Sequence, residues 1–310
     1  MATSSGWNAE RLWQDLVSVW PGISVEVLPE VASTNTQLLQ RTSGPLPCLL
    51  VAEHQTQGRG RMGRHWVSAP GASLTFTLAL PLAPQRWEGL SLAVGLALAQ
   101  ALDPLIDPVI DSLIRPVRAL EVDPLLDPMP AGRQPRLLLK WPNDLWLADS
   151  AHVGRKLGGV LIETTQRGSQ RFCVVGVGLN VQALPPRAAA PMVGDGSLAH
   201  GHASLHELYP GIDAPQALAR VALPLALALR RFENTGFAPL RRDYAARDLL
   251  QGRAVTTTTV PALQGVAQGV DDDGALRVLA DGVMHRVHSG EVSVRLQAPQ
   301  RARPRTEAAD

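Results

Sequence analysis

Hydrophobic residues recur at two different spacings along the first third of the chain. Residues 7–20 place Trp and Leu side chains about 3.6 positions apart, which predicts a short amphipathic helix. The stretch 88–102, which is apolar and uncharged from Leu90 to Leu102, predicts a second, buried helix. Between them, Ser33 precedes a helical segment as an N-cap residue would. Runs of apolar and β-branched residues predict strands at 23–29, 47–55 and 72–82.

The middle of the chain continues this mixed pattern. Residues 136–147 predict a strand that ends in a turn at 142–144. Residues 156–165 and 171–181 predict two strands that lie next to each other in one sheet. Helical patterns cover residues 204–209, 214–232 and 237–249. Together these elements predict a body of class α/β (α+β) with a mixed sheet.

The sequence pattern changes after the last predicted helix. Short Thr- and Val-rich runs separated by tight turns predict a small β-barrel over residues 251–297, which leaves 1–250 as the larger domain. Residues 103–136 repeat Asp-Pro units, and because so many prolines forbid a long helix we expect an irregular insertion there. Residues 183–203 predict a loop, and 298–310 predict a disordered tail.

Composition narrows the class of protein. The 310 residues carry a formal net charge of +1, which argues against a protein that coats nucleic acid or an anionic membrane. No apolar run reaches the ~20 residues of a membrane span, and the N-terminus lacks the pattern of a signal peptide. Cys48 and Cys173 lie in apolar surroundings without a CxxC motif, which predicts buried, reduced thiols. We therefore expect a soluble, cytoplasmic protein.

Positive charge is concentrated in one flexible loop, GRGRMGRHW at residues 58–66. Glycine and arginine alternate along it, at Gly58, Arg59, Gly60, Arg61, Gly63 and Arg64. Glycine lets the backbone come close to a ligand, and each guanidinium matches phosphate or carboxylate oxygens. The pattern favours an anion-binding loop that becomes ordered around its ligand. A contact to RNA, or a plain solvated loop, is the alternative, although RNA-binding repeats usually carry more interleaved aromatic residues.

Further polar residues follow apolar runs. Lys140 comes directly after three leucines, so we expect its ammonium group at the end of a core strand, where ligands tend to sit in α/β proteins. A lysine that reaches the surface is the alternative. Asn143 and Asp144 are typical of a turn, and Asp144 could also hold Mg²⁺. The glycines of GVGLN at 176–180 indicate close packing within a strand.

Two other clusters are less specific. Ser33, Thr34 and Asn35 form either a plain N-cap or a cradle of hydroxyl and amide groups for a neutral polar ligand. His200, His202 and His206 have a spacing that invites a zinc site. Because no cysteine or carboxylate supports that set, a polar loop is the favoured interpretation.

Six stretches, in this order, resemble the biotin–protein ligases: STNTQLL, AEHQTQGRGRMGRHW, KWPNDLW, RKLGGVLIE, GVGLN and DDDGAL…SGEVSVR. Together they span most of residues 30–296. The resemblance implies a catalytic domain related to class II aminoacyl-tRNA synthetases, followed by an SH3-like barrel. It also implies a two-step reaction. The carboxylate of biotin attacks the α-phosphate of MgATP to give biotinyl-5′-adenylate, and a lysine on the biotin carboxyl carrier domain of acetyl-CoA carboxylase then accepts the biotin and releases AMP.

The resemblance also implies roles for individual residues. The expected biotin-binding residues are Ser33, Thr34, Asn35, Gln55, Arg59, Gly60, Arg61 and Lys140, and Arg59, Arg61 and Lys140 are also expected to be catalytic. The expected ATP- or phosphate-binding residues are Gly58, Arg64, Trp66, Asn143, Asp144, Lys156 and Asn180. Since two anionic reactants must meet, cations aimed at the developing charge should carry much of the catalysis. Closure of the loop should then shield the adenylate from water.

Two other functions stay open at this point. A lipoate–protein ligase would share fold and chemistry, but it would not require the loop together with KWPND. A regulator that binds nucleic acid through the basic loop would show steeply salt-dependent binding and no nucleotide turnover. Thirty-two residues precede Ser33, too few for the DNA-binding domain that some biotin–protein ligases carry, so we expect a monofunctional ligase that does not bind DNA. The chain is expected to be a monomer or a homodimer.

Overall fold

The computed structural model describes residues 6–41, 47–104, 136–148, 154–184, 201–258, 261–288 and 294–296. Most of the predicted insertion at 103–136, most of the predicted loop at 183–203 and the whole predicted tail at 298–310 lie outside these residues. No helix within the described part is both long and apolar enough to cross a membrane.

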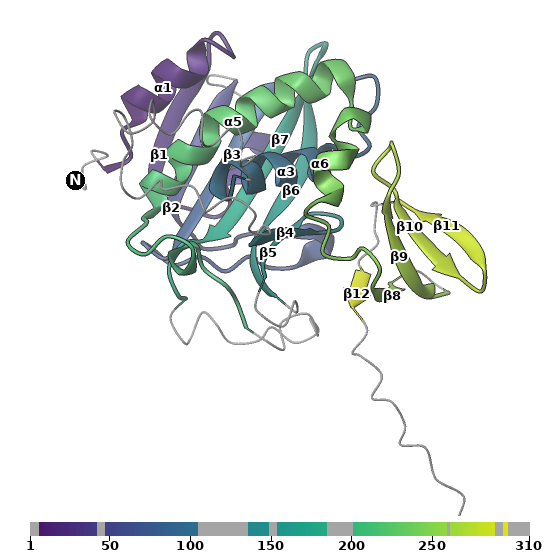
Figure 1. Ribbon diagram of the computed structural model, residues 1–310. Coiled ribbons are helices and arrows are strands. Elements are labelled where there is room, and N and C mark those ends of the chain that lie inside the picture. The colour runs from purple at the N-terminus through teal and green to yellow at the C-terminus, as the bar shows by residue number, and fades with distance from the viewer. Residues whose placement is uncertain are drawn as a thin grey trace, which may run out of the picture.

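Seven strands of the described chain form one mixed sheet, in the order β1-β2-β3-β7-β6-β5-β4 (Figure 1). β1 and β2 are parallel, whereas the other neighbours are antiparallel. The strands are β1 (Ser24–Val31), β2 (Cys48–Gln55), β3 (Ser73–Pro81), β4 (Leu137–Lys140), β5 (Asp144–Leu147), β6 (Arg155–Arg167) and β7 (Gln170–Asn180). The mixed sheet and the pairing of β6 with β7 confirm the sequence-based predictions.

Alternation along β2 separates two apolar layers. Leu49 and Val51 point into the main core, which also includes side chains of three helices, α1 (Ala9–Val17), α3 (Leu90–Leu102) and α5 (Ala214–Thr235). Figure 1 shows these helices lying across one face of the sheet. Cys48 and Leu50 point to the other face and pack with Leu38 of α2 (Thr34–Gln40) in a smaller cluster. The N-terminal residues of α2 line the pocket described below.

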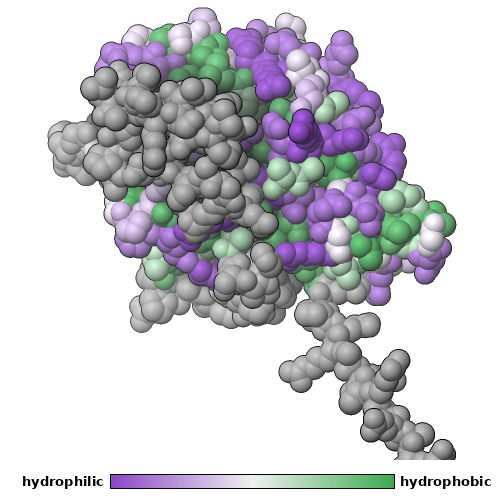
Figure 2. All heavy atoms as spheres, in the orientation of Figure 1, coloured by the Kyte–Doolittle hydropathy of each residue, from purple (hydrophilic) through white to green (hydrophobic). Residues whose placement is uncertain are grey.

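The chain ends in a separate antiparallel sheet with strand order β11-β10-β9-β8-β12. Its strands are β8 (Ala254–Thr257), β9 (Gln264–Val270), β10 (Leu276–Ala280), β11 (Val283–Val287) and β12 (Val294–Leu296). Figure 2 shows hydrophobic residues over this sheet; its exposed large hydrophobic residues are Val266, Leu279, Val283 and Met284. The predicted region of short strands is therefore present, and its closure into a barrel stays a prediction.

A tight turn of the small sheet is seated against the larger one. The indole N–H of Trp141, which is 1% exposed, donates to the carbonyl of Gly274 at 3.0 Å. A Cβ on Gly274 would lie 2.8 Å from the Cα of Gly89, at the start of α3, so the backbones of these two segments are in close contact. Arg86 and Asp273 add an ion pair of 2.8 Å beside this contact. The turn thus supports the segment between β4 and β5.

Three helix predictions differ in length from the structure. The predicted helix 237–249 is instead a 3₁₀ turn at Ala238–Leu240 followed by the short α6 (Arg241–Ala245). From Arg247 to Leu249 the backbone leaves the helix and pairs with Leu139. The predicted helix 204–209 shortens to a 3₁₀ turn, while α5 extends three residues beyond its predicted end. An edge strand that needs backbone partners therefore overrides the helical pattern of residues 247–249.

The two cysteines are free and buried, as predicted. Burial raises the pKa of the Cys48 thiol to about 11 and that of Cys173 to about 12. Both thiols therefore stay protonated at neutral pH and act as small apolar side chains.

Candidate functional site

A pocket of about 430 Å³ opens where the N-terminus of α2, the loop 58–66, β6 and β7 and the turn between β4 and β5 meet. The pocket brings together nearly all the residues singled out in the sequence: Ser33, Thr34, Asn35, Gln55, Arg59, Gly60, Arg61, Arg64, Trp66, Lys140, Asn143, Asp144, Lys156 and Asn180. Gly58 is not part of the lining, but its carbonyl accepts a hydrogen bond from the backbone N–H of Trp66 at 2.8 Å. Stretches more than a hundred residues apart in sequence thus form one site.

The floor of the pocket is polar and uncharged. The Oε1 of Gln55 accepts from the backbone N–H of Thr34 at 2.7 Å and lies 3.1 Å from its hydroxyl. Thr77 of β3 places its hydroxyl 2.8 Å from that of Thr34 and donates to the Oδ1 of Asn35 at 2.7 Å. Ser33 caps α2 by accepting from the N–H of Thr36. Ser33 is therefore the N-cap expected from the sequence, whereas the role of residues 33–35 as a cradle for a ligand stays a prediction.

Two glycines of β7 make room for this arrangement. A Cβ on Gly176 would lie 2.1 Å from the Oδ1 of Asn35, and one on Gly178 would lie 2.4 Å from the indole of Trp66. Real side chains cannot approach so closely, so the strand tolerates only glycine at these positions without displacement of its neighbours. The close packing predicted for GVGLN is confirmed. The two glycines leave room for Asn35 of the pocket floor and for Trp66 of the loop.

The basic loop folds back on itself over the pocket. The backbone N–H of Gly60 donates to the carbonyl of Arg64 at 2.7 Å, and Arg59 pairs with His65 in an antiparallel bridge. At the tip, Met62 has a φ of 57° and Gly63 a φ of 70°. Left-handed backbone at two successive residues produces the sharp reversal. The Nε1–H of Trp66, at the end of the loop, is buried without a hydrogen-bond partner in the described chain.

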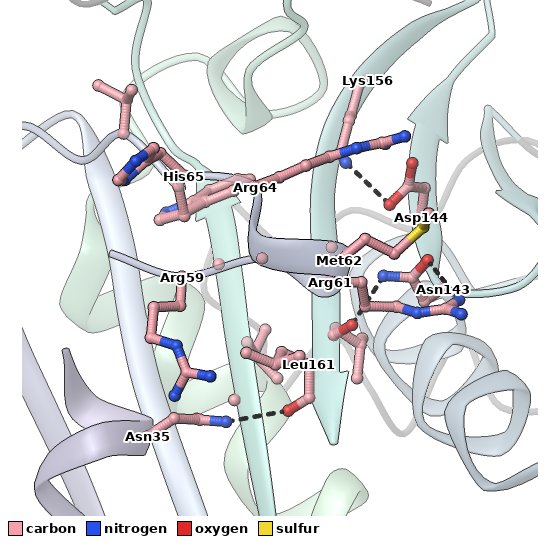
Figure 3. A pocket seen from close by; sticks show the side chains of 18 of the residues that line it. Asn35, Arg59, Arg61, Met62, Arg64, His65, Asn143, Asp144, Lys156 and Leu161 are labelled. Carbon is pink, nitrogen blue, oxygen red and sulfur yellow. Dashed lines mark hydrogen bonds and ion pairs between the residues drawn. The ribbon is translucent and has the colours of Figure 1, made fainter. Parts of the chain in front are cut away.

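Two cations rest on polar partners at the other end of the pocket (Figure 3). The Nζ of Lys156 lies 2.8 Å from the Oδ1 of Asp144, and the Nη1 of Arg61 donates to the Oδ1 of Asn143 at 3.4 Å. Burial lowers the pKa of Arg61, and Asp144 opposes that shift by favouring the charged form. Since arginine stays charged at neutral pH, Arg61 and Lys156 place two half-buried cations at this end of the pocket.

Lys140 is the last residue of β4, and it is buried rather than reaching the surface. It is 7% exposed, and its Nζ lies 4.8 Å from the ring centre of Trp146 on the neighbouring strand β5. The sequence-based argument used a rule for parallel sheets, whereas β4 is an antiparallel edge strand. The lysine nevertheless lines the pocket.

Sequence inspection missed several residues of the site. Thr77 and Glu163 lie within long strands, and nothing around them in the sequence points to a ligand. Glu163 accepts hydrogen bonds from Asn35 and Arg59. Val294 and Arg295 of β12 also line the pocket, so the small sheet contributes to its rim. Their signal was present in the motif SGEVSVR, which was assigned to the C-terminal domain without a role in the site.

The described residues contain no group of three or more His, Cys, Asp or Glu side chains that could hold a metal ion. His200 lies outside the described residues, and the backbone of His202 bridges to that of Lys156. Among the described residues that line the pocket, Asp144 is the single acidic one. The donor set of this chain thus offers one carboxylate to a cation, too few for a protein-only metal site.

Family models match both parts of the chain. Residues 27–180 match the biotin/lipoate A/B protein ligase family, and residues 251–295 match the biotin protein ligase C-terminal domain. The chain belongs to the biotin protein ligase family. The match covers the α2, loop, β4, β6 and β7 segments that form the pocket, together with the small sheet that reaches its rim.

Named relatives agree with this assignment. The chain is 32% identical over 280 residues to the bifunctional ligase/repressor BirA of Escherichia coli, an alignment that covers 88% of this chain and 75% of BirA. It is 31% identical to the biotin–[acetyl-CoA-carboxylase] ligase of Mycobacterium tuberculosis, covering 86% of this chain and 88% of that ligase. The solved biotin protein ligase of Aquifex aeolicus in complex with biotin and ATP has the same fold, with a TM-score of 0.64 at 24% identity over 88% of this chain and 99% of the other.

Proposed function

We propose that this protein is a biotin–[acetyl-CoA-carboxylase] ligase, which activates biotin with ATP and transfers it to a lysine of a biotin carboxyl carrier domain. One observation carries the proposal: a single pocket has a neutral, hydrogen-bonding end and a cationic end. Thr34, Asn35 and Gln55 lie at the first end, joined by hydrogen bonds among themselves and to Thr77. Figure 3 shows Arg61 and Lys156 away from Asn35, toward the second end. Biotin has the matching polarity, because its ureido ring is neutral and its valerate chain ends in a carboxylate.

In the first step, an oxygen of the biotin carboxylate attacks the α-phosphorus of ATP. The bond from that phosphorus to the bridging oxygen of pyrophosphate breaks, and biotinyl-5′-adenylate forms. Both reactants are anionic, so the approach needs cations nearby. We assign this role to Arg61 and Lys156, with Lys140 and Arg64 as further positive charge in the lining. The unpartnered Nε1–H of Trp66 supports a hydrogen bond to a substrate acceptor.

Magnesium belongs to the proposal as a companion of ATP. A magnesium ion commonly keeps several waters and is bound through one or two carboxylates plus substrate phosphates. Asp144 would supply the protein ligand, and the ion would neutralise charge on the phosphates. Asp144 forms an ion pair with Lys156, so its engagement with magnesium would free that lysine for the substrate anion.

In the second step, the Nζ of the acceptor lysine attacks the acyl carbon of the adenylate. The bond from that carbon to the phosphate oxygen breaks, AMP leaves, and the amine loses its proton to solvent. The mixed anhydride is prone to hydrolysis, so water has to be kept out until the acceptor arrives. The loop 58–66 lies over the pocket and is suited to this role.

The domain organisation supports the same function. We infer that residues 1–250 form a catalytic domain related to class II aminoacyl-tRNA synthetases and that 251–297 form an SH3-like barrel. Five strands in one antiparallel sheet agree with such a barrel. Val294 and Arg295 reach the pocket from this sheet, so the smaller domain would help to close the site.

The experiment that tests the proposal is pyrophosphate exchange into ATP with biotin, with lipoate or with no acid added. Exchange that depends on biotin is the expected result, since the exchange reaction requires a reversible adenylation step. A purified carrier domain should then become labelled at one lysine. Exchange with lipoate alone would assign the protein to the lipoate ligases instead. No exchange with either acid, in folded protein with magnesium present, would overturn the proposal.

A further inference from the structure

Glu163 lies in the middle of β6, paired with Val174 of β7, just outside the pocket lining. Its two carboxylate oxygens accept from two different parts of the site. Oε2 accepts from the Nδ2 of Asn35 at 3.0 Å, and Oε1 accepts from the Nη2 of Arg59 at 3.1 Å. The side chain is 24% exposed, so these contacts are partly shielded from water. One carboxylate therefore joins the pocket floor to the start of the loop 58–66.

At the Asn35 end of this connection, hydrogen bonds fix the orientation of the side-chain amide. Its Nδ2 also donates to the carbonyl of Leu161 at 3.2 Å, and its Oδ1 accepts from the hydroxyl of Thr77 at 2.7 Å. Asn35 is 3% exposed and its amide packs against Gly176. A buried amide with both ends in use has one orientation, and loss of the Glu163 acceptor would leave one of its N–H groups without that partner.

The Arg59 end fixes the loop. Its Nη1 donates to the hydroxyl of Thr36 at 3.3 Å while its Nη2 donates to Glu163. The guanidinium of Arg59 thus connects α2 to β6, and Arg59 itself is the second residue of the loop. Figure 3 shows Arg59 turned toward Asn35, away from Lys156 and Asp144. Its charge is already paired with a carboxylate, so in this arrangement Arg59 acts on the loop and Arg61 faces the cationic end.

We propose that Glu163 is a positioning residue for the ligase reaction: it ties the loop 58–66 to Asn35, so that the floor that holds the biotin head group and the loop that covers the adenylate keep one geometry. The inference rests on the proposed function. Because both ends share one carboxylate, neither can shift without straining the other. Loss of the tie should weaken biotin binding and loosen the loop, while the cations at Arg61 and Lys156 keep their place.

The test is Glu163→Gln. Glutamine keeps one acceptor oxygen but presents an NH₂ group in place of the second, so it cannot accept from both Asn35 and Arg59. With about one charge-assisted hydrogen bond lost, we expect the KM for biotin in pyrophosphate exchange to rise about tenfold, with kcat within about twofold of wild type. Trypsin cleaves after arginine, and cleavage after Arg61 and Arg64 in the ligand-free protein should become about tenfold faster, because the loop opens more often.

A double variant tests whether Glu163 and Arg59 act through their mutual contact or independently of each other. Arg59→Gln should raise the KM for biotin and the rate of tryptic cleavage as Glu163→Gln does. The double variant Glu163→Gln/Arg59→Gln should show values no higher than those of the stronger single variant. Glu26→Gln is the matched control. Glu26 of β1 forms an ion pair of 2.7 Å with Arg41, lies outside the pocket lining and has a side chain that is 28% exposed. The control should leave both the KM for biotin and the cleavage of the loop at wild-type values.

Several results would overturn the inference. These are wild-type KM and cleavage rates in Glu163→Gln, additive effects in the double variant, or a lower kcat with an unchanged KM. If Glu163→Gln does not fold, Arg59→Gln breaks the same contact from the exposed side and carries the comparison alone. A wild-type protein without biotin-dependent exchange would contradict the proposed function, and the cleavage rates would still decide whether Glu163 holds the loop.

Discussion

At the scale of single residues, three cations at the pocket each contact a polar partner, and two of these partners are carboxylates. Lys156 rests on Asp144, Arg59 on Glu163, and Arg61 on the neutral Asn143. Charged residues beside glycines are visible in a sequence, which is why these cations could be predicted. Glu163 could not, because its partner Asn35 lies 128 positions away and only the folded sheet brings the two together.

Arg61 is the cation whose removal should be most informative. Its guanidinium is partly buried, donates a hydrogen bond to the amide oxygen of Asn143 and is close enough to Asp144 for that carboxylate to favour its charged form. Arg61→Ala should lower kcat/KM for biotin-dependent pyrophosphate exchange about 100- to 1000-fold, as expected when one donor to the developing charge is lost. The melting temperature should change little, because the side chain lies in a loop.

The control for this prediction is Arg11→Ala. Arg11 is a largely exposed arginine of α1, and its ion pair with Asp15 lies outside the pocket lining. A wild-type exchange rate in Arg61→Ala, with the fold intact, would remove Arg61 from the site. An equal loss in both variants would indicate a general effect of charge instead.

At the scale of elements, the strands were the most predictable part of the fold. Apolar runs such as 171–181 have one structural solution, a strand buried on both faces, and β7 occupies it. The predicted helix 237–249 was wrong over its second half, because the edge of β4 offers backbone groups that Arg247 and Leu249 satisfy. Sequence periodicity carries no information on such a long-range demand.

The glycines of β7 give a prediction at this scale. In Gly178→Ala the new Cβ would meet the indole of Trp66 at 2.4 Å, so the ring and the loop behind it must move. We expect a loss of about 1–3 kcal/mol in the free energy of unfolding, typical of overpacking, together with weaker biotin binding. Chemical denaturation and calorimetric titration with biotin measure the two effects. Gly6→Ala, with open space around its Cβ, should change neither, and a fully stable Gly178→Ala would show that Trp66 is not confined by this strand.

At the scale of the whole molecule, the two sheets meet around the segment that follows α6. Leu139 of β4 pairs with Asp248, next in the chain to the residues that lead into the small sheet. A Cβ on Gly269 of β9 would lie 4.0 Å from the Oδ2 of Asp248. That oxygen is buried without a hydrogen-bond partner in the described chain, as is the hydroxyl of Tyr244. The junction therefore contains a carboxyl group that is easier to bury when neutral.

Burial raises the pKa of Asp248 to about 6, against the opposing effects of the Leu250 N–H and the charge of Arg253. A folded-state pKa above that of the unfolded chain stabilises the protonated, folded form at low pH. This contribution is lost as the pH rises from about 4 through about 6, and it amounts to about 3 kcal/mol. Asp248→Asn keeps an acceptor for the Leu250 N–H and carries no charge. The free energy of unfolding of the variant should therefore rise relative to that of wild type between pH 4 and 6, and it should remain higher at pH 7. Urea unfolding of both proteins between pH 4 and 7 measures the difference. Other carboxyl groups titrate equally in the two proteins, so a difference that does not change with pH would show that Asp248 is not buried in its neutral form.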